Sequence, residues 1–288
     1  MDVQTAHASI LHAKDFQSLR RSSAEILALN VLIPLLALVS SGICLLPEKL
    51  GVPPWMIFFA NIVLTTQIAI LTHELIHEPA SATRWNLPLR INLHLYSPFT
   101  VGFAEYRRLH GLHHVNANCP ESDPDYFFIR GGGLRAFLTL AFAPEYLFFY
   151  VLHKKEAQPD FYAFHLCRNG LLLGYIYLLG FWTFALLFFI PAKLAWGIGF
   201  LLFSYESHID EHGIREGSFN LEPQSALLRM LLKLLVGPYA YYVAFSHASH
   251  HAYPRASGRK RGRLSGLREQ KNTRLPAREL KPGAYVSL

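Results

Sequence analysis

Long apolar runs alternate with polar segments along this chain. The first run, Ile26–Leu46, has 21 residues without a charge, about the length that an α-helix needs to cross the hydrocarbon core of a bilayer. A short turn, Pro47–Pro54, separates it from a second predicted helix, Trp55–His77, which begins with seventeen uncharged and mostly apolar residues. The two runs predict a transmembrane hairpin whose last turn extends beyond the hydrocarbon.

A second hairpin is predicted after a polar middle section that runs from Glu78 to about Arg168. Its first helix is Gly170–Ile190, stopped by Pro191, and its second begins with Leu194–Tyr205. The pattern therefore predicts an all-α integral membrane protein, with four transmembrane helices in two hairpins, interfacial helices and a cytoplasmic cap that carries histidines. Two apolar stretches, Leu134–Leu152 and Leu227–Phe245, are interrupted by Pro144-Glu145 and by Gly237-Pro238. They are expected to form helices that lie at the membrane interface or pack against the site.

The composition agrees with a membrane location. Hydrophobic residues make up 51% of the 288 residues and charged residues 16%, whereas soluble domains carry roughly 25% charged residues. The net charge of +7 is a property of the C-terminus, because ten Lys or Arg and two acids lie from Arg255 onwards, leaving 17 basic and 18 acidic residues before it. We predict one membrane domain over residues 1–254, a basic flexible tail over residues 255–288 that is attracted to anionic lipid, and no nucleic-acid partner.

The positions of the cations also predict an orientation. The two short turns hold only Lys49 and Lys193 as cations, whereas the N-terminal segment, the middle section and the tail hold many more. Loops rich in Lys and Arg stay in the cytoplasm. Both termini and every histidine group are therefore expected on the cytoplasmic face of a multi-pass protein, in a bacterial inner membrane or the endoplasmic reticulum.

Ten of the fifteen histidines fall into four tight groups, HELIH, HGLHH, HIDEH and HASHH. Spacings of i, i+3 and i+4 place side chains on one face of a helix, so each group is expected to point its imidazoles one way. So many imidazoles exceed the three protein ligands of a catalytic zinc site and predict two metal ions. The predicted ligands are His73, His77, His110, His113, His114, His208, His212, His247, His250 and His251.

HELIH also reads as H-E-x-x-H, the signature of zinc proteases, in which Glu74 would act as a general base. That alternative needs one further ligand and leaves the other groups without a role. A metal transporter is a third alternative, but it would need ionisable residues distributed through the bilayer, whereas here they cluster at one end. Imidazole suits Zn, Cu, Fe and Ni, so the ligand type alone does not choose the metal.

The order HxxxH, HxxHH, HxxHH, with paired spans before the first group and between the second and third, resembles the membrane fatty-acid desaturase superfamily. That superfamily includes alkane monooxygenases and carotenoid hydroxylases. HGLHHVNANCPESDPD is similar to the second histidine box of bacterial desaturases and carotenoid hydroxylases, and HELIHE and HASHHAYP are similar to boxes of alkane monooxygenases. His212 resembles an additional metal-binding histidine of the family, and His208 stands where some members have asparagine, which leaves its role open.

The resemblance implies an oxidoreductase that uses two Fe²⁺ ions and O2 to attack an unactivated C–H bond of a lipid chain. Fatty acyl desaturation is the first expectation, and hydroxylation of a fatty acid, an alkane or a carotenoid is the alternative. A separate electron donor of the ferredoxin, rubredoxin or cytochrome b5 type is implied, since the chain has no fused haem-binding H-P-G-G segment. No catalytic residue beyond the metal ligands is expected. Carboxylates near the boxes are expected to balance the metal charge and orient the imidazoles, the candidates being Glu74, Asp123, Asp125 and Glu211.

Overall fold

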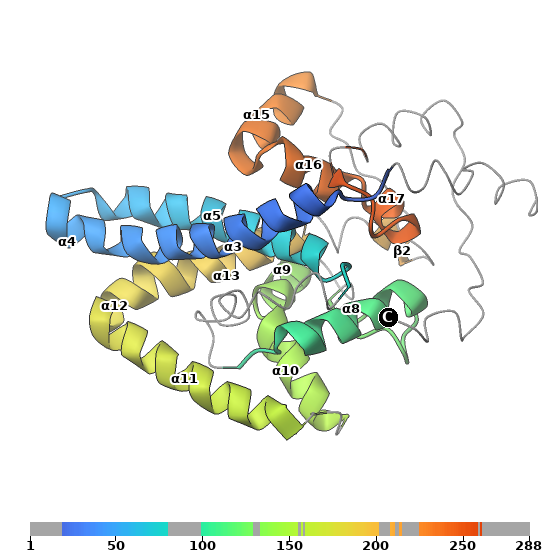
Figure 1. Cartoon of the computed structure of the whole chain (residues 1–288), viewed down its shortest axis with the longest axis horizontal. Helices are drawn as coiled ribbons and strands as arrows, with labels where there is room; N and C mark the ends of the chain where they lie inside the picture. Colours follow the sequence, from blue (N-terminus) through green and yellow to red (C-terminus); the bar gives the residue numbers. More distant parts are fainter. Residues whose placement is uncertain are drawn as a thin grey trace, which may run out of the picture.

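The structure, a computed structural model, describes residues 19–79, 99–128, 133–154, 157, 159–201, 208–210, 213–214, 225–258 and 260. Within these residues the secondary structure is helical, apart from the two-residue strands β1 (Ile209–Asp210) and β2 (Gly213–Ile214), which pair antiparallel. The long helices of residues 23–75 extend towards one end of the molecule, and the helices of residues 103–116 and 247–252 lie towards the other (Figure 1). The predicted all-helical class is confirmed for this part of the chain.

The first predicted hairpin is confirmed. α3 (Ser23–Gly42) continues through η1 (Ile43–Leu45) and α4 (Leu46–Leu50), and α5 (Pro54–Leu75) returns alongside α3 (Figure 1). Pro54 opens α5, where the missing amide hydrogen of proline has no intrahelical acceptor to lose. The hairpin turn therefore falls between residues 50 and 54, within the predicted segment.

The second predicted hairpin has other boundaries. α11 spans Pro159–Leu179, and a continuous helical segment then runs from residue 181 to residue 200. This segment consists of α12 (Phe181–Phe184), the π-helical η2 (Ala185–Phe189) and α13 (Ile190–Phe200). The predicted helices 170–190 and 194–205 are therefore wrong in their boundaries, and the turn lies eleven residues before Pro191.

Gly180 and Pro191 explain this difference. Gly180 adopts φ 77°, a left-handed conformation that costs a residue without Cβ little energy, so the chain turns there. Pro191 lies in the first turn of α13, directly after the π-helical segment. A proline removes one backbone hydrogen bond from a regular helix, and here it follows a segment whose hydrogen-bond ladder is already shifted. The helix continues through the predicted stop.

Three helices of the described residues are long and apolar enough to cross a membrane: Ser23–Leu45, Pro54–Leu75 and Phe181–Ile198. The pair Gly133–Thr139 and Ala143–His153, bent by 70°, would make a fourth if it formed one broken span. α11 has 21 residues but is not among these spans. The prediction of a membrane protein is supported, whereas four spans in two hairpins are not confirmed.

Shorter helices at the other end of the bundle carry most of the histidines. The predicted break at Gly237-Pro238 is confirmed, because Gly237 adopts φ 82° between two helices, whereas the break near Pro144 falls earlier, at Phe142. The interfacial placement of these helices remains a prediction. They are α8 (Phe103–Asn116), α9 (Gly133–Ala141), α10 (Ala143–His153), α15 (Ala226–Val236), α16 (Pro238–Phe245) and α17 (His247–Ala252).

A buried polar cluster holds the long helices in register. The Ser40 hydroxyl of α3 donates to Asn61 Oδ1 of α5 at 2.6 Å, and Asn61 Nδ2 donates to the carbonyl oxygen of Leu187 in η2 at 2.5 Å. Carbonyls released by a shifted helical ladder must find other donors inside a membrane, and Asn61 supplies one. Because α5 is fixed in this way against α3 and the π-helical segment, its C-terminal end meets the helices that carry the other histidines.

Candidate metal centre

Nine of the ten predicted ligands belong to the described residues, and all nine converge at one end of the bundle. His73 lies in the last turn of α5 and His77 two residues beyond its end. α8 supplies His110, His113 and His114, and α17 supplies His247, His250 and His251. His208 precedes β1, while His212 and the candidate carboxylate Glu211 lie outside the described residues.

The HIDEH group does not form the predicted helix face. Ile209–Asp210 pairs with Gly213–Ile214 as a two-residue antiparallel ladder, so the helical conformation of His208 does not continue into the residues that follow it. The helical spacing rule was therefore wrong for this group, although His208 itself lies among the other imidazoles.

The first cluster contains His73, His77, His110 and His250. Each offers one ring nitrogen, and these four atoms lie within 4.8 Å of one another. The ring centroid of His73 is 4.4 Å from that of His110 and 4.5 Å from that of His250. The cluster thus joins the first, second and third histidine boxes, which are far apart in the sequence.

The second cluster contains His113, His208, His247 and His251, whose ligand atoms also lie within 4.8 Å of one another. Nε2 of His247 is 3.1 Å from Nε2 of His208 and 3.1 Å from Nε2 of His251. His208 has no exposed surface. Its ring therefore occupies the same kind of position as the histidines of the boxes.

His114 lies between the two clusters. Its Nε2 is 2.9 Å from Nε2 of His110 and 3.1 Å from Nε2 of His250, so its nitrogen faces the first cluster. Its ring stacks on that of His251, with centroids 4.3 Å apart, and so contacts the second cluster. The two clusters are consequently adjacent.

The donor set fits two metal ions. Nitrogens bound to one ion at about 2.1 Å lie about 3 Å apart, which matches the Nε2 separations of 2.9 and 3.1 Å. Burial, together with the neighbouring imidazoles, lowers the pKa of His110, His247 and His251 below its usual value. These three rings are therefore neutral at pH 7, as metal ligands must be.

Comparison with protein-family models matches residues 47–270 to the family described as fatty acid desaturase. This match covers more than half of the chain and includes both histidine clusters. The chain belongs to the fatty acid desaturase family. Comparisons with curated proteins and with solved structures found no match. The family is one of oxidoreductases, and among the described residues of this desaturase-family protein the two clusters could hold metal.

In this desaturase-family protein, Asp123 supports the second cluster. Its Oδ1 is 2.9 Å from Nδ1 of His113, and its two oxygens accept hydrogen bonds from the backbone amides of Asn118 and Asp125 at 2.8 Å. Asp125 lies further away, with Oδ2 3.8 Å from Nδ1 of His113. Burial alone would lower the pKa of His113, but the two carboxylates outweigh it and raise this pKa to about 9. A proton held on Nδ1 leaves Nε2 as the ring atom that could bind a metal ion.

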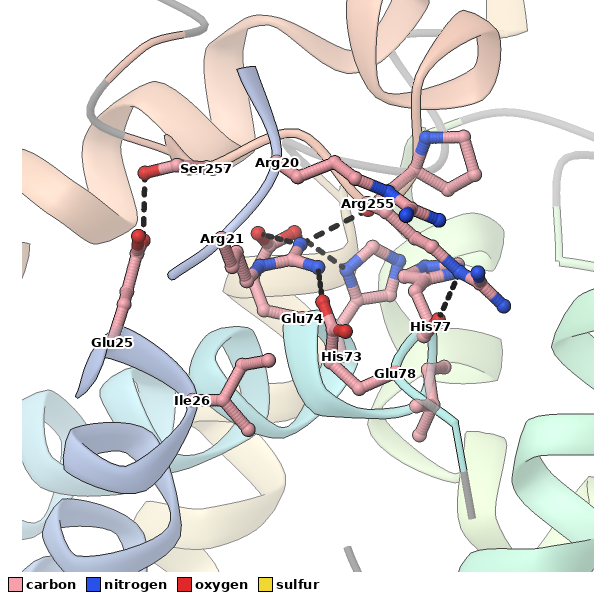
Figure 2. A network of polar contacts seen from close by, with 12 residues as sticks. Arg20, Arg21, Glu25, Ile26, His73, Glu74, His77, Glu78, Arg255 and Ser257 are labelled. Atoms are coloured by element: carbon pink, nitrogen blue, oxygen red, sulfur yellow. Dashed lines mark hydrogen bonds and ion pairs between the residues drawn. The ribbon is translucent and has the colours of Figure 1, made fainter. Parts of the chain in front are cut away.

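Glu74 lies behind the first cluster. This carboxylate has no exposed surface, and its Oε1 is 3.6 Å from Nδ1 of His250 and 4.0 Å from Nδ1 of His73. Its Oε2 forms an ion pair with Arg21 (Figure 2). A protease base must be free to take a proton from metal-bound water, so the buried Arg21–Glu74 pair disfavours the zinc-protease alternative.

Arg21 is the residue of the site that sequence reasoning missed. It is separated from Glu74 by 53 positions, and beside Arg20 it appears in the sequence as an ordinary positive charge before a membrane span. Arg21 also lies outside residues 47–270, the part of the chain that matches the family, so the family comparison does not point to it. An arginine just before the first span could be considered as an ion-pair partner for Glu74, the acid within HELIH. The spacing of the two residues in the sequence does not indicate that they meet.

An apolar cavity of about 30 Å³ opens beside the histidine-bearing helices. Tyr106 lines it, and its ring centroid is 6.0 Å from that of His110. The lining is mostly hydrophobic and comes from α5, α8, α10, α13 and the segments between them. The lining residues are Ala69, Thr72, Thr100, Val101, Tyr106, Asp125, Phe128, Ala143, Pro144, Leu147 and Trp196.

Proposed function

We propose that this protein is a two-iron, O2-dependent oxidoreductase that desaturates a fatty acyl chain. The observation that carries the proposal is the adjacency of two four-imidazole clusters, with His114 between them. A single-metal hydrolase needs only three protein ligands, so the second cluster would have no role in it. The family supports the oxidoreductase class, and the desaturation reaction is our proposal.

The residues divide between two proposed ion positions. His73, His77, His110, His114 and His250 would hold one ion. His113, His208, His247 and His251 would hold the other, and we add His212 to the proposed ligands from the family resemblance. Iron bound there would supply the O2 activation that breaking an unactivated C–H bond requires.

The electron balance requires a second protein. Forming one carbon–carbon double bond releases two electrons and two protons, whereas reducing O2 to two waters consumes four of each. The remaining two electrons are proposed to come from a separate ferredoxin, rubredoxin or cytochrome b5 type donor. We propose that both termini and the histidine clusters face the cytoplasm, on the basis of the cation-poor turns, where such a donor could reach them.

The chain's own groups hold protons and exclude water. Asp123 keeps the Nδ1 proton of His113 in place, which orients the ring through a bond of 2.9 Å. Trp196 and Leu147 belong to the apolar wall of the cavity, which favours a hydrocarbon chain over water. Residues of α5 and α8 contribute to the lining, so an apolar group that enters the cavity would lie next to helices that carry the clusters.

Mass spectrometry of lipids from cells that express the protein tests this function. We expect acyl chains that have lost two hydrogens, and we expect none in matched cells that express His247→Ala to the same level. Cells grown under ¹⁸O2 separate the two family reactions, because a desaturated product contains no new oxygen atom. A labelled alcohol as the main product would contradict desaturation and would establish the hydroxylase alternative.

A further inference from the structure

The guanidinium of Arg21 joins the first histidine box to Pro254, which lies three residues after the third box. Its Nη2 pairs with Glu74 and donates to the carbonyl oxygen of Pro254 at 3.0 Å, and its Nη1 donates to Glu78 Oε1 at 2.5 Å (Figure 2). The side chain of Arg21 has no exposed surface. Charge-assisted contacts of this forked kind fix direction as well as distance.

Backbone hydrogen bonds join the segment around Arg21 to residues 255 and 257, which are more than 230 positions away in the sequence. The Arg21 amide donates to the carbonyl oxygen of Arg255 at 3.3 Å, and the Ser257 amide donates to that of Leu19 at 2.8 Å. The Ser257 hydroxyl donates to Glu25 Oε1 at 2.6 Å (Figure 2). We call residues 19–21 and 254–257 the terminal clasp. The clasp fixes where the Arg21 side chain starts, so that its guanidinium reaches Glu74.

Glu74 transmits this position to two imidazoles. With Oε2 bound by Arg21, the other oxygen, Oε1, faces Nδ1 of His250 and Nδ1 of His73. A carboxylate on the Nδ1 side of a histidine orients the ring and leaves Nε2 for the metal. One carboxylate therefore faces ligands from two different boxes, at 3.6 and 4.0 Å.

The negative charge of buried Glu74 also requires the ion pair with Arg21. A buried carboxylate remains an anion only when an opposite charge or several donors stabilise it. Glu74 has no exposed surface, and Arg21 supplies the opposite charge. Removal of the guanidinium would leave Glu74 free to turn away from the rings, while the contacts that Asp123 makes at the second cluster would be untouched.

We propose that Arg21 is a positioning residue for the first cluster, holding Glu74 so that its carboxylate orients both His73 and His250. The proposal rests on the proposed two-metal function. It assigns a role in metal binding to a residue before the first span and outside the family match, residues 47–270.

Binding of chelator-buffered Zn²⁺ to the purified full-length protein tests this role without requiring turnover. The clusters are separated by background variants: His247→Ala leaves the first cluster complete, and His250→Ala leaves the second complete. In the first background, Arg21→Gln is expected to weaken Zn²⁺ binding about 10–100-fold, the usual range for losing the partner of a ligating histidine. In the second background it is expected to change binding little.

Three further variants separate positioning from a general loss of structure. Arg21→Lys keeps the charge and is expected to restore part of the affinity. Glu74→Gln should weaken the first cluster as Arg21→Gln does, and the double variant should be no weaker than either single one, because Arg21 acts through Glu74. Lys49→Gln removes an exposed cation from the turn of the first hairpin, far from both clusters in the fold, and is expected to leave both affinities unchanged.

The outcomes distinguish this inference from the function on which it rests. Wild-type protein that binds fewer than two Zn²⁺ ions would overturn both proposals. Two ions in the wild type, with first-cluster affinity unchanged in Arg21→Gln, would overturn the role of Arg21 alone. Equal weakening of both clusters, or additive effects of Arg21→Gln and Glu74→Gln, would overturn it as well.

Discussion

Replacing His250 with alanine is expected to reduce product formation more than about a hundredfold and to remove the iron of the first cluster. His250 has no exposed surface, its ligand atom belongs to the first cluster, and its Nε2 lies 3.1 Å from that of His114. Loss of a residue that merely supports a metal ligand costs 10–100-fold in affinity or activity. Loss of the ligand itself should cost more.

The measurement pairs metal analysis of the purified variant with mass spectrometry of its lipid products. His153→Ala is the matched control, because His153 is an exposed histidine in the last turn of α10. It should keep wild-type iron and activity. His250→Gln, which leaves a smaller cavity than alanine, should behave like His250→Ala. Full turnover with undiminished iron in either His250 variant would rule out a ligand role for this residue.

Replacing Asp123 with asparagine is expected to weaken metal binding at the second cluster and to change its pH dependence. In the metal-free protein the carboxylates of Asp123 and Asp125 raise the pKa of His113 to about 9. A metal ion that binds Nε2 must then displace a proton at any lower pH. Affinity at this cluster should therefore rise about tenfold per pH unit from pH 7 towards pH 9.

Asparagine keeps the shape of Asp123 but removes its charge, so the pKa of His113 should fall and the rise in affinity between pH 7 and 9 should flatten. At pH 9 we expect the variant to bind about 10–100-fold more weakly than the wild type. Chelator-buffered Zn²⁺ titrations in the His250→Ala background measure both effects, and Glu121→Gln, an exposed acid two positions away, is the control. A variant with the same pH dependence as the wild type would show that Asp123 does not hold the His113 proton.

The sequence predicts which histidines gather at the site better than it predicts the residues that hold them there. The i, i+3, i+4 spacing of His110, His113 and His114 follows directly from helix geometry, and α8 presents them as expected. The same rule is wrong for the HIDEH group, because a spacing of four residues does not reveal that Ile209–Asp210 pairs as a strand with Gly213–Ile214. How the nine histidines divide into two clusters depends on the packing of α5, α8 and α17, which no local spacing encodes.

Two long-range contacts mark the limit of prediction. Asp123 was a candidate because it lies only ten residues from His113. Arg21 and Glu74, by contrast, meet only when the segment before α3, the end of α5 and the segment that contains Pro254 pack together. The predicted boundaries of the second hairpin were wrong for a related reason. A proline normally marks a helix end, but Pro191 follows a π-helical segment whose Leu187 carbonyl is bound by Asn61 from another helix. Local rules do not include such partners.

The central claim is that two adjacent imidazole clusters hold a pair of iron ions, and metal analysis of the purified protein tests it most directly. We expect about two irons per chain in the wild type and about one in each of His247→Ala and His250→Ala. One zinc per chain, or a single iron that either substitution removes completely, would contradict the two-metal centre.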